Sequence, residues 1–308
     1  MSLVINHNLM AMNSARNLSN SYSNLATSTR RLSSGLRVST AADDAAGLAI
    51  RELMRADIAS LNQGVRNAND AISMIQTADG ALGVIDEKLI RMKELATQAA
   101  TGTYGSDQRL IIDSEYQAMA SEITRIANAT DFNGIYLLNG NLSSSYQNAA
   151  EWRLDHSGEA LQSRGALKIH FGTGNDSSED YYYIAIGNST ASALGVGNQS
   201  DRSISSAGFS ISTQQGAQQA LDAINQAIIS KDKIRASLGS LQNRLENTIT
   251  NLQIQAENLQ AAESRISDVD VAKEMKEFVR NQILTQAAVA MLAQANQLPQ
   301  MAMQLMQG

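Results

Sequence analysis

The sequence has 308 residues, with 24 Lys and Arg against 30 Asp and Glu, 43% hydrophobic but only 4% aromatic residues, one proline and no cysteine. The net charge of -6 argues against a nucleic-acid partner, because such surfaces carry a basic stripe. The lack of cysteine excludes disulfides, thiolate metal sites and thiol nucleophiles. The single proline permits long helices almost everywhere, and the aliphatic content suits narrow helix seams.

Neither end of the chain predicts a membrane segment. The first ten residues have no basic region and no long apolar core, so they do not form a Sec signal peptide. The longest apolar run, residues 287–293, is too short to span a bilayer. We therefore expect no membrane insertion, and any export would use another route.

The first 130 residues predict three helices. Within residues 3–36, Leu18, Leu25 and Leu32 fall seven apart, a coiled-coil-like stripe, and Gly35 is a plausible stop. A long helical segment over residues 43–101 follows, with apolar residues at helical spacing. After a turn rich in glycine, a third helix is expected over residues 106–128.

Residues 131–212 differ in composition, being rich in Gly, Asn, Ser and Thr. Short runs of β-forming residues at 135–138, 166–171 and 181–186 predict small antiparallel strands in a compact β-containing insert. The two G-x-G sequences in this insert lack a strand-to-helix context, so they are weak evidence of a nucleotide site.

From residue 212 the pattern is helical again and carries the strongest repeat in the chain. The repeat is a seven-residue spacing of Leu238, Leu245, Leu252, Leu259 and Ile266. Such a repeat implies a supercoiled partner helix, for which residues 43–101 are the natural choice. Residues 268–270 interrupt the pattern, and a last helix is expected from about Val271. The predicted fold is therefore mainly α, a long antiparallel coiled-coil-like helical rod with a small β-containing insert.

No catalytic or metal-binding pattern is present in the sequence. The histidines, His7, His156 and His170, lack zinc-site spacing, and there is no H-E-x-x-H and no G-x-S-x-G. The acidic pairs at 43–44 and 268/270 stand where helices begin, which favours helix capping over paired-carboxylate chemistry. We expect no enzyme activity, no cofactor and no metal.

The terminal segments indicate association. Each carries a narrow apolar stripe but few bulky side chains, so an isolated copy would be a marginal helix. If the ends pair with each other and with neighbouring copies, head-to-tail contacts would produce a helical filament. Periodicity alone leaves a monomeric helical bundle equally open.

Several motifs resemble those of bacterial flagellins. Residues 31–37 (RLSSGLR) with 41–50 (AADDAAGLAI) resemble the N-terminal flagellin signature. Further motifs match in order at 132–134 (FNG), 264–270 (SRISDVD), 272–275 (AKEM) and 292–300 (LAQANQLPQ). The resemblance covers about residues 1–140 and 212–308, and the short middle suggests a short form without large outer domains.

The resemblance implies a structural subunit that polymerises into the flagellar filament used for swimming. Residues 1–43 and 267–308 would form the inner D0 layer, and residues 44–266 the D1 rod, with the insert at about 131–212. The four leucines and the isoleucine of the seven-residue repeat, at positions 238, 245, 252, 259 and 266, would form the D1 seam. The residues expected in D0 assembly are Leu18, Leu25, Leu32, Ile283 and Leu292.

The family also implies partners and a location. Flagellins leave the cell unfolded through the flagellar type III export apparatus, with an export chaperone on the C-terminal helix. The expected partners are other copies of the chain, that chaperone, and the filament cap and hook-junction proteins. The expected location is the secreted, extracellular flagellar filament.

Residues 90–96 (IRMKELA) resemble the D1 segment through which many flagellins bind the flagellin-sensing Toll-like receptor of animal hosts. The candidate receptor-binding residues are Arg91, Leu95, Glu115, Ile90 and Glu94. Arg91 and Leu95 are four apart on one helix face, so we expect a cation and an apolar side chain to enter one groove. The alternative is that these residues serve D1 packing and contacts between subunits.

Two rival functions remain at this stage. A hook–filament junction protein has similar termini, although such proteins usually carry a larger middle and a divergent 41–50 signature. An extracellular enzyme would need a catalytic insert, and this insert has no convincing site.

Overall fold

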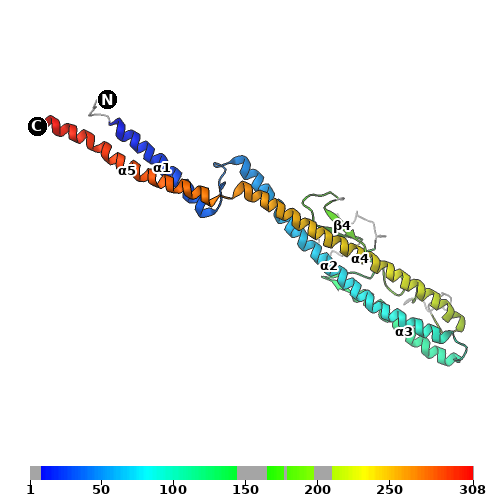
Figure 1. Cartoon of the computed structure of the whole chain (residues 1–308). Helices are drawn as coiled ribbons and strands as arrows, with labels where there is room; N and C mark the ends of the chain where they lie inside the picture. Colours follow the sequence, from blue (N-terminus) through cyan, green and yellow to red (C-terminus); the bar gives the residue numbers. More distant parts are fainter. Residues whose placement is uncertain (1–7, 144–164, 177–178, 198–209, 308) are drawn as a thin grey trace, which may run out of the picture. The chain divides into compact units, whose positions relative to one another are not determined.

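The computed structural model describes residues 8–143, 165–176, 179–197 and 210–307 (Figure 1). Its helices are α1 (Leu9–Ser34), α2 (Ala45–Ala100), α3 (Ser106–Ala129), α4 (Gln214–Ser267) and α5 (Val271–Gln307). The strands are β1 (Asp131–Phe132), β2 (Ile135–Tyr136), β3 (Leu167–His170) and β4 (Tyr181–Ile184). The mainly α prediction is confirmed.

The chain divides into two compact units. Unit 1 comprises residues 1–58 and 256–308, and unit 2 comprises residues 59–255. Long helices α2 and α4 contribute residues to both units.

Unit 2 has a continuous apolar core. Helices α2, α3 and α4 lie side by side there (Figure 1), and their inward side chains form one cluster with residues from the β hairpins. Fully buried members of this core are Leu82, Ile85, Leu89, Met92, Tyr116, Ile123, Leu137, Leu138, Ile224 and Leu245. Burial raises the pKa of the Tyr116 phenol well above its usual range.

The seven-residue repeat of α4 faces this core. Leu238, Leu245 and Leu252 are buried, whereas Leu259 and Ile266, which belong to unit 1, are half-buried. The repeat extends backwards through Lys231, Ile224 and Ala217, which are also buried. One position of this seam is therefore a lysine.

Lys231 is 2% exposed and is held by carboxylates. Its Nζ lies 2.5 Å from Asp86 Oδ1 on α2 and 2.8 Å from Asp232 Oδ1 on its own helix. One turn later, Arg235 Nε lies 2.7 Å from Asp79 Oδ1, and this guanidinium lowers the pKa of Asp79. From the first ion pair to the second, the residue number rises along α4 and falls along α2. The two helices are therefore antiparallel, as predicted.

The first hairpin explains the Phe-Asn-Gly sequence. β1 and β2 are joined by Asn133 (φ 51°) and Gly134 (φ 80°), both in the left-handed region. A two-residue hairpin turn of this type needs positive φ at both central positions, which Asn-Gly tolerates best. The expected strand over 135–138 ends at Tyr136, and the buried Leu137 donates instead to the Thr130 carbonyl.

The second hairpin packs against the helices. β3 and β4 pair antiparallel from Leu167↔Ile184 to His170↔Tyr181. The expected strand over 181–186 ends at Ile184, because Ile186 N–H donates to the Leu142 carbonyl outside the hairpin. The Tyr182 ring faces the Arg244 guanidinium of α4 at 4.2 Å.

Gly64 on α2 permits the second hairpin to approach this helix closely. A Cβ at Gly64 would lie 2.8 Å from the carbonyl carbon of Phe171 and closer still to its oxygen. Beside it, Asn67 Nδ2 donates to the His170 carbonyl at 2.8 Å. Any side chain at position 64 must therefore displace the end of β3.

In unit 1, α1 packs along α5. The Asn8 side chain donates to the Ala295 carbonyl at 2.8 Å. At the other end Gly35 terminates α1, as predicted, with φ 72° and an N–H bond to the Arg31 carbonyl. Arg37 N–H then donates to Ser267 O at 2.7 Å, which ties the chain after α1 to the end of α4.

The acidic pairs serve mainly as caps, as expected. Asp44 Oδ1 accepts from Gly47 N–H at the start of α2, and Asp270 Oδ1 accepts from Lys273 N–H at the start of α5. Asp43 accepts from the Thr40 hydroxyl and ion-pairs with Arg30 at 3.0 Å, and its pKa is lowered mainly by the Thr40 hydrogen bond.

Substitution of Gly64 tests the close approach of the hairpin. Gly64→Ala should lower the free energy of unfolding by about 1–3 kcal/mol, since the added methyl group overpacks the contact. Gly80→Ala and Gly83→Ala are matched controls on α2, because a Cβ at either position meets nothing within 4 Å. The controls should raise stability by about 0.5–1 kcal/mol in denaturant unfolding. A stabilising effect at Gly64 as well would contradict the contact.

Removal of Asp86 tests the ion pair in the seam. Asp86→Ala should lower the free energy of unfolding by about 3 kcal/mol, since it leaves the Lys231 ammonium buried with only one partner. The control is Asp232→Ala, which removes a partner that is 60% exposed and should cost less than about 1 kcal/mol. Denaturant unfolding measures both variants. Equal losses of unfolding free energy would show that the interhelical pair stabilises the fold no more than the exposed pair does.

Candidate functional site

The paired helices α1 and α5 present large apolar side chains to solvent. We call this set the terminal-helix apolar surface, and each member is at least 44% exposed. Its members are Leu9, Met10, Met12, Tyr22, Val271, Met275, Val279, Ile283, Leu284, Val289, Met291 and Met301. Extended exposed apolar surface on a protein marks an interaction site.

Among the side chains of α1 and α5 that the structure describes, the fully buried ones are small or polar. They are Ser28, Glu274, Asn281, Thr285 and Ala295. Glu274 faces Arg31 of α1 at 3.8 Å, so part of the contact between the helices is ionic. The larger apolar side chains that this pair covers, the leucines at positions 18, 25, 32 and 292, are only half-buried.

The residues expected in D0 assembly fall into two groups. Leu18, Leu25, Leu32 and Leu292 are half-buried, and Ile283 is 59% exposed. Sequence reasoning missed most of the terminal-helix apolar surface, because its members do not follow the seven-residue spacing. The available signal was the density of Met, Val and Ile in residues 271–291.

A second candidate surface lies on unit 2, where α2 meets α3. Arg91 donates to Glu94 Oε2 at 2.9 Å and, through Nη2 and Nε, to Glu115 Oε1 at 2.8 and 3.0 Å. The Glu115 bond is the main cause of a raised Arg91 pKa. All three side chains are at least 43% exposed, and Ile90 beside them is also exposed. The structure therefore brings four of the five candidate receptor residues together.

Leu95 does not join this surface. It is 2% exposed and belongs to the core of unit 2, together with Met92, Ala96 and Ala99. Four residues turn an α-helix by about 400°, so Leu95 lies about 40° further round than Arg91, toward the core. The expectation that Arg91 and Leu95 enter one groove together is corrected accordingly.

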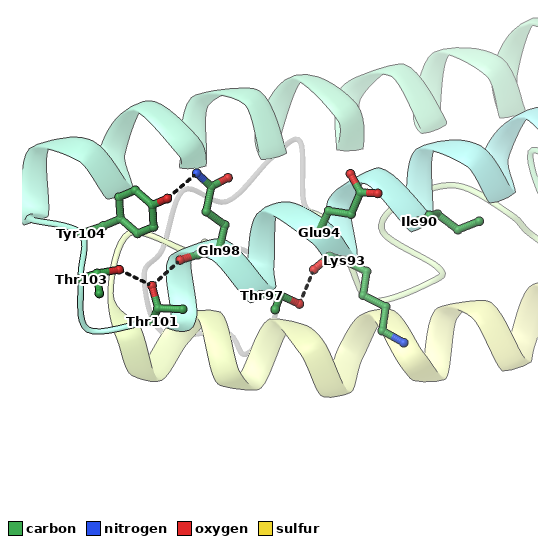
Figure 2. A pocket seen from close by; sticks show the side chains of 8 residues that line it. All are labelled: Ile90, Lys93, Glu94, Thr97, Gln98, Thr101, Thr103 and Tyr104. Carbon is green, nitrogen blue, oxygen red and sulfur yellow. Dashed lines mark hydrogen bonds between the residues drawn. The ribbon is translucent and has the colours of Figure 1, made fainter.

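A shallow hollow of about 590 Å³ adjoins Ile90 and runs to the end of α2. Figure 2 shows its lining of Ile90, Lys93, Glu94, Thr97, Gln98, Thr101, Thr103 and Tyr104. Among the lining residues, the Tyr104 hydroxyl accepts from Gln98 Nε2 at 3.2 Å. Most of its lining residues have uncharged side chains, and Lys93 and Glu94 are the charged ones.

Metal and membrane sites receive no support from the described residues. Within them, no group of three or more His, Cys, Asp or Glu is arranged to hold a metal ion. His170 stacks on Tyr181 at 6.1 Å between ring centroids, while His7 and His156 lie outside the described ranges. None of the helices described has the length and apolar character needed to cross a bilayer.

Comparison with known proteins gives consistent matches over the whole chain. Residues 5–143 match the bacterial flagellin N-terminal helical region, and residues 221–306 match the bacterial flagellin C-terminal helical region. A flagellin of Halalkalibacterium halodurans is 41% identical, with 99% of this chain and 100% of that protein covered. The flagellar filament 33 kDa core protein of Treponema phagedenis is 40% identical, again with 99% of this chain and 100% of that protein covered. Among solved structures, a flagellin of Bacillus cereus aligns with a TM-score of 0.45 and 29% identity, over 64% of this chain and 94% of that one.

Proposed function

The chain belongs to the bacterial flagellin family and is a structural subunit of the flagellar filament, and we propose that its terminal-helix apolar surface joins the subunits. The family is non-enzymatic, in agreement with the sequence-based expectation. The observation that carries the proposal is the exposure of the large apolar residues of α1 and α5, with polar residues between the helices.

Burial of apolar surface away from water would supply the free energy of assembly. Apolar surface removed from water contributes about 25 cal/mol per Å², and the α1–α5 pair leaves many of its large apolar side chains exposed. A second copy that covers the exposed side would supply the missing burial. Because head-to-tail contacts repeat without closing, the product is a helical polymer.

The domain division is part of the same proposal. D0 would comprise residues 1–43 and 267–308, and D1 residues 44–266 with the insert. The breaks between α1 and α2 and between α4 and α5 support these boundaries. The two compact units divide further along the helices, at 58/59 in α2 and 255/256 in α4. The seam residues of α4 would then stabilise D1, and the terminal helices would mediate assembly.

A charge on the terminal-helix apolar surface tests the assembly role. Ile283→Asp should abolish filament formation while changing the stability of the subunit by less than about 0.5 kcal/mol, since the side chain is exposed in the single chain. Ile283→Leu keeps the apolar area and should assemble normally. Electron microscopy and sedimentation of concentrated protein measure both. Filaments from the aspartate variant would contradict the proposal.

We also propose the route by which the subunit reaches the filament. The chain would pass unfolded through the flagellar type III apparatus, with an export chaperone on α5, and would meet the hook-junction and cap proteins outside the cell. The exposed apolar residues of α5 support a need for cover before assembly. Export is tested by locating the protein in cells that have the apparatus and in cells that lack it. The protein should remain inside only the cells that lack the apparatus.

We further propose that the α2–α3 surface binds the host flagellin-sensing Toll-like receptor, as many flagellins do. The residues assigned are Arg91, Ile90, Glu94 and Glu115. Arg91 presents a guanidinium already oriented by two carboxylates, which lowers the entropy lost on binding. The same surface is also a candidate for contacts between subunits, and binding to the receptor would then require the free subunit.

Arg91→Ala tests the receptor proposal. It should weaken receptor activation by the free subunit at least about 30-fold, as expected for an arginine hot spot. Arg125→Ala is the matched control, because Arg125 makes a similar exposed pair with Glu122 elsewhere on α3. Both variants should keep the parent melting temperature, since exposed ion pairs contribute little. Equal activity of the two variants would remove Arg91 from the receptor site.

A further inference from the structure

The sulfur atoms of the chain are distributed unevenly. The sequence has 12 methionines and no cysteine, so thioethers are its only oxidisable sulfur. Among the side chains that the structure describes, the exposed methionines all lie on α1 and α5: Met10, Met12, Met275, Met291 and Met301. In unit 2, Met74 and Met92 are buried and Met119 is half-buried.

These exposed methionines belong to the terminal-helix apolar surface. Methionine suits such a surface because its unbranched, polarisable side chain adapts to a neighbour of irregular shape. The same thioether is accessible to oxidants whenever the subunit is not assembled. The residues that assembly would bury are therefore the residues most open to chemical change beforehand.

The oxidation is a simple oxygen transfer. The sulfur lone pair attacks one oxygen of hydrogen peroxide, the O–O bond breaks, and the products are methionine sulfoxide and water. The sulfoxide is polar and accepts hydrogen bonds, so it opposes burial in an apolar contact. Methionine sulfoxide reductases reverse the change.

We propose that Met10, Met12, Met275, Met291 and Met301 form an oxidant-sensitive site that controls polymerisation, because peroxide converts the apolar assembly surface of the free subunit into a polar one. This inference rests on the proposed assembly role of α1 and α5. Unit 2 keeps its fold during the reaction, since Met74 and Met92 are buried in its core and Met119 is half-buried against it. Subunits already in a filament are protected, since neighbouring copies cover their thioethers.

The test uses the full chain treated with hydrogen peroxide and then freed of it. Mass spectrometry of peptides should show the five exposed methionines oxidised at least about tenfold faster than Met74 and Met92, as exposure dictates. Treated protein should give few or no filaments by electron microscopy, while treatment after assembly should leave filaments intact. Incubation of treated subunits with methionine sulfoxide reductases and a dithiol, which is oxidised to the disulfide as the sulfoxide is reduced, should restore assembly.

A matched variant identifies the responsible residues. A chain with Met→Leu at positions 10, 12, 275, 291 and 301 keeps the apolar surface and should assemble equally before and after peroxide. Normal assembly of the treated parent, loss of assembly in the treated leucine variant, or no rescue by the reductases would each overturn the proposal. Failure of the untreated parent to assemble would instead contradict the assembly role itself, and the inference with it.

Discussion

Two helices packed side by side can cover only one face of each other, and this limit determines what the ends of the chain require. In unit 1, the fully buried residues of α1 and α5 are small or polar, such as Ser28 and Thr285, and many of the large apolar side chains of these helices face water. Unit 2 has no such deficit, because three helices and two hairpins enclose its core. The chain therefore combines a complete core with a helix pair that gains burial only from further copies.

The core of unit 2 also shows how pairing between long helices is made unique. An apolar stripe alone can slide by whole turns, whereas a polar residue at a seam position fixes the register. Lys231 occupies such a position between Ile224 and Leu238, and its ammonium group pairs with Asp86 on the facing helix α2. Gly64 adds a second constraint, since the absence of a Cβ at this position lets the residue after β3 approach α2 closely.

The sequence predicts features with local causes well. Gly35 terminates α1, Asp44 and Asp270 cap the helices that follow them, and Asn133-Gly134 forms a tight turn, because each depends on a few neighbouring residues. The positions of α2 and α4 follow from apolar spacing. Features with distant partners were not accessible: the burial of Leu95 depends on where α3 packs, and the Lys231 partner lies 145 residues away. The hollow at the end of α2 likewise needs the turn that carries Tyr104.

The most direct test of the assembly account is the structure of the filament itself, determined by cryo-electron microscopy on polymers of the full chain. The account predicts that Leu9, Tyr22, Ile283 and Met291, all exposed in the single chain, are buried in contacts between neighbouring subunits. A filament in which these side chains still face solvent, with subunits joined through unit 2 alone, would contradict it.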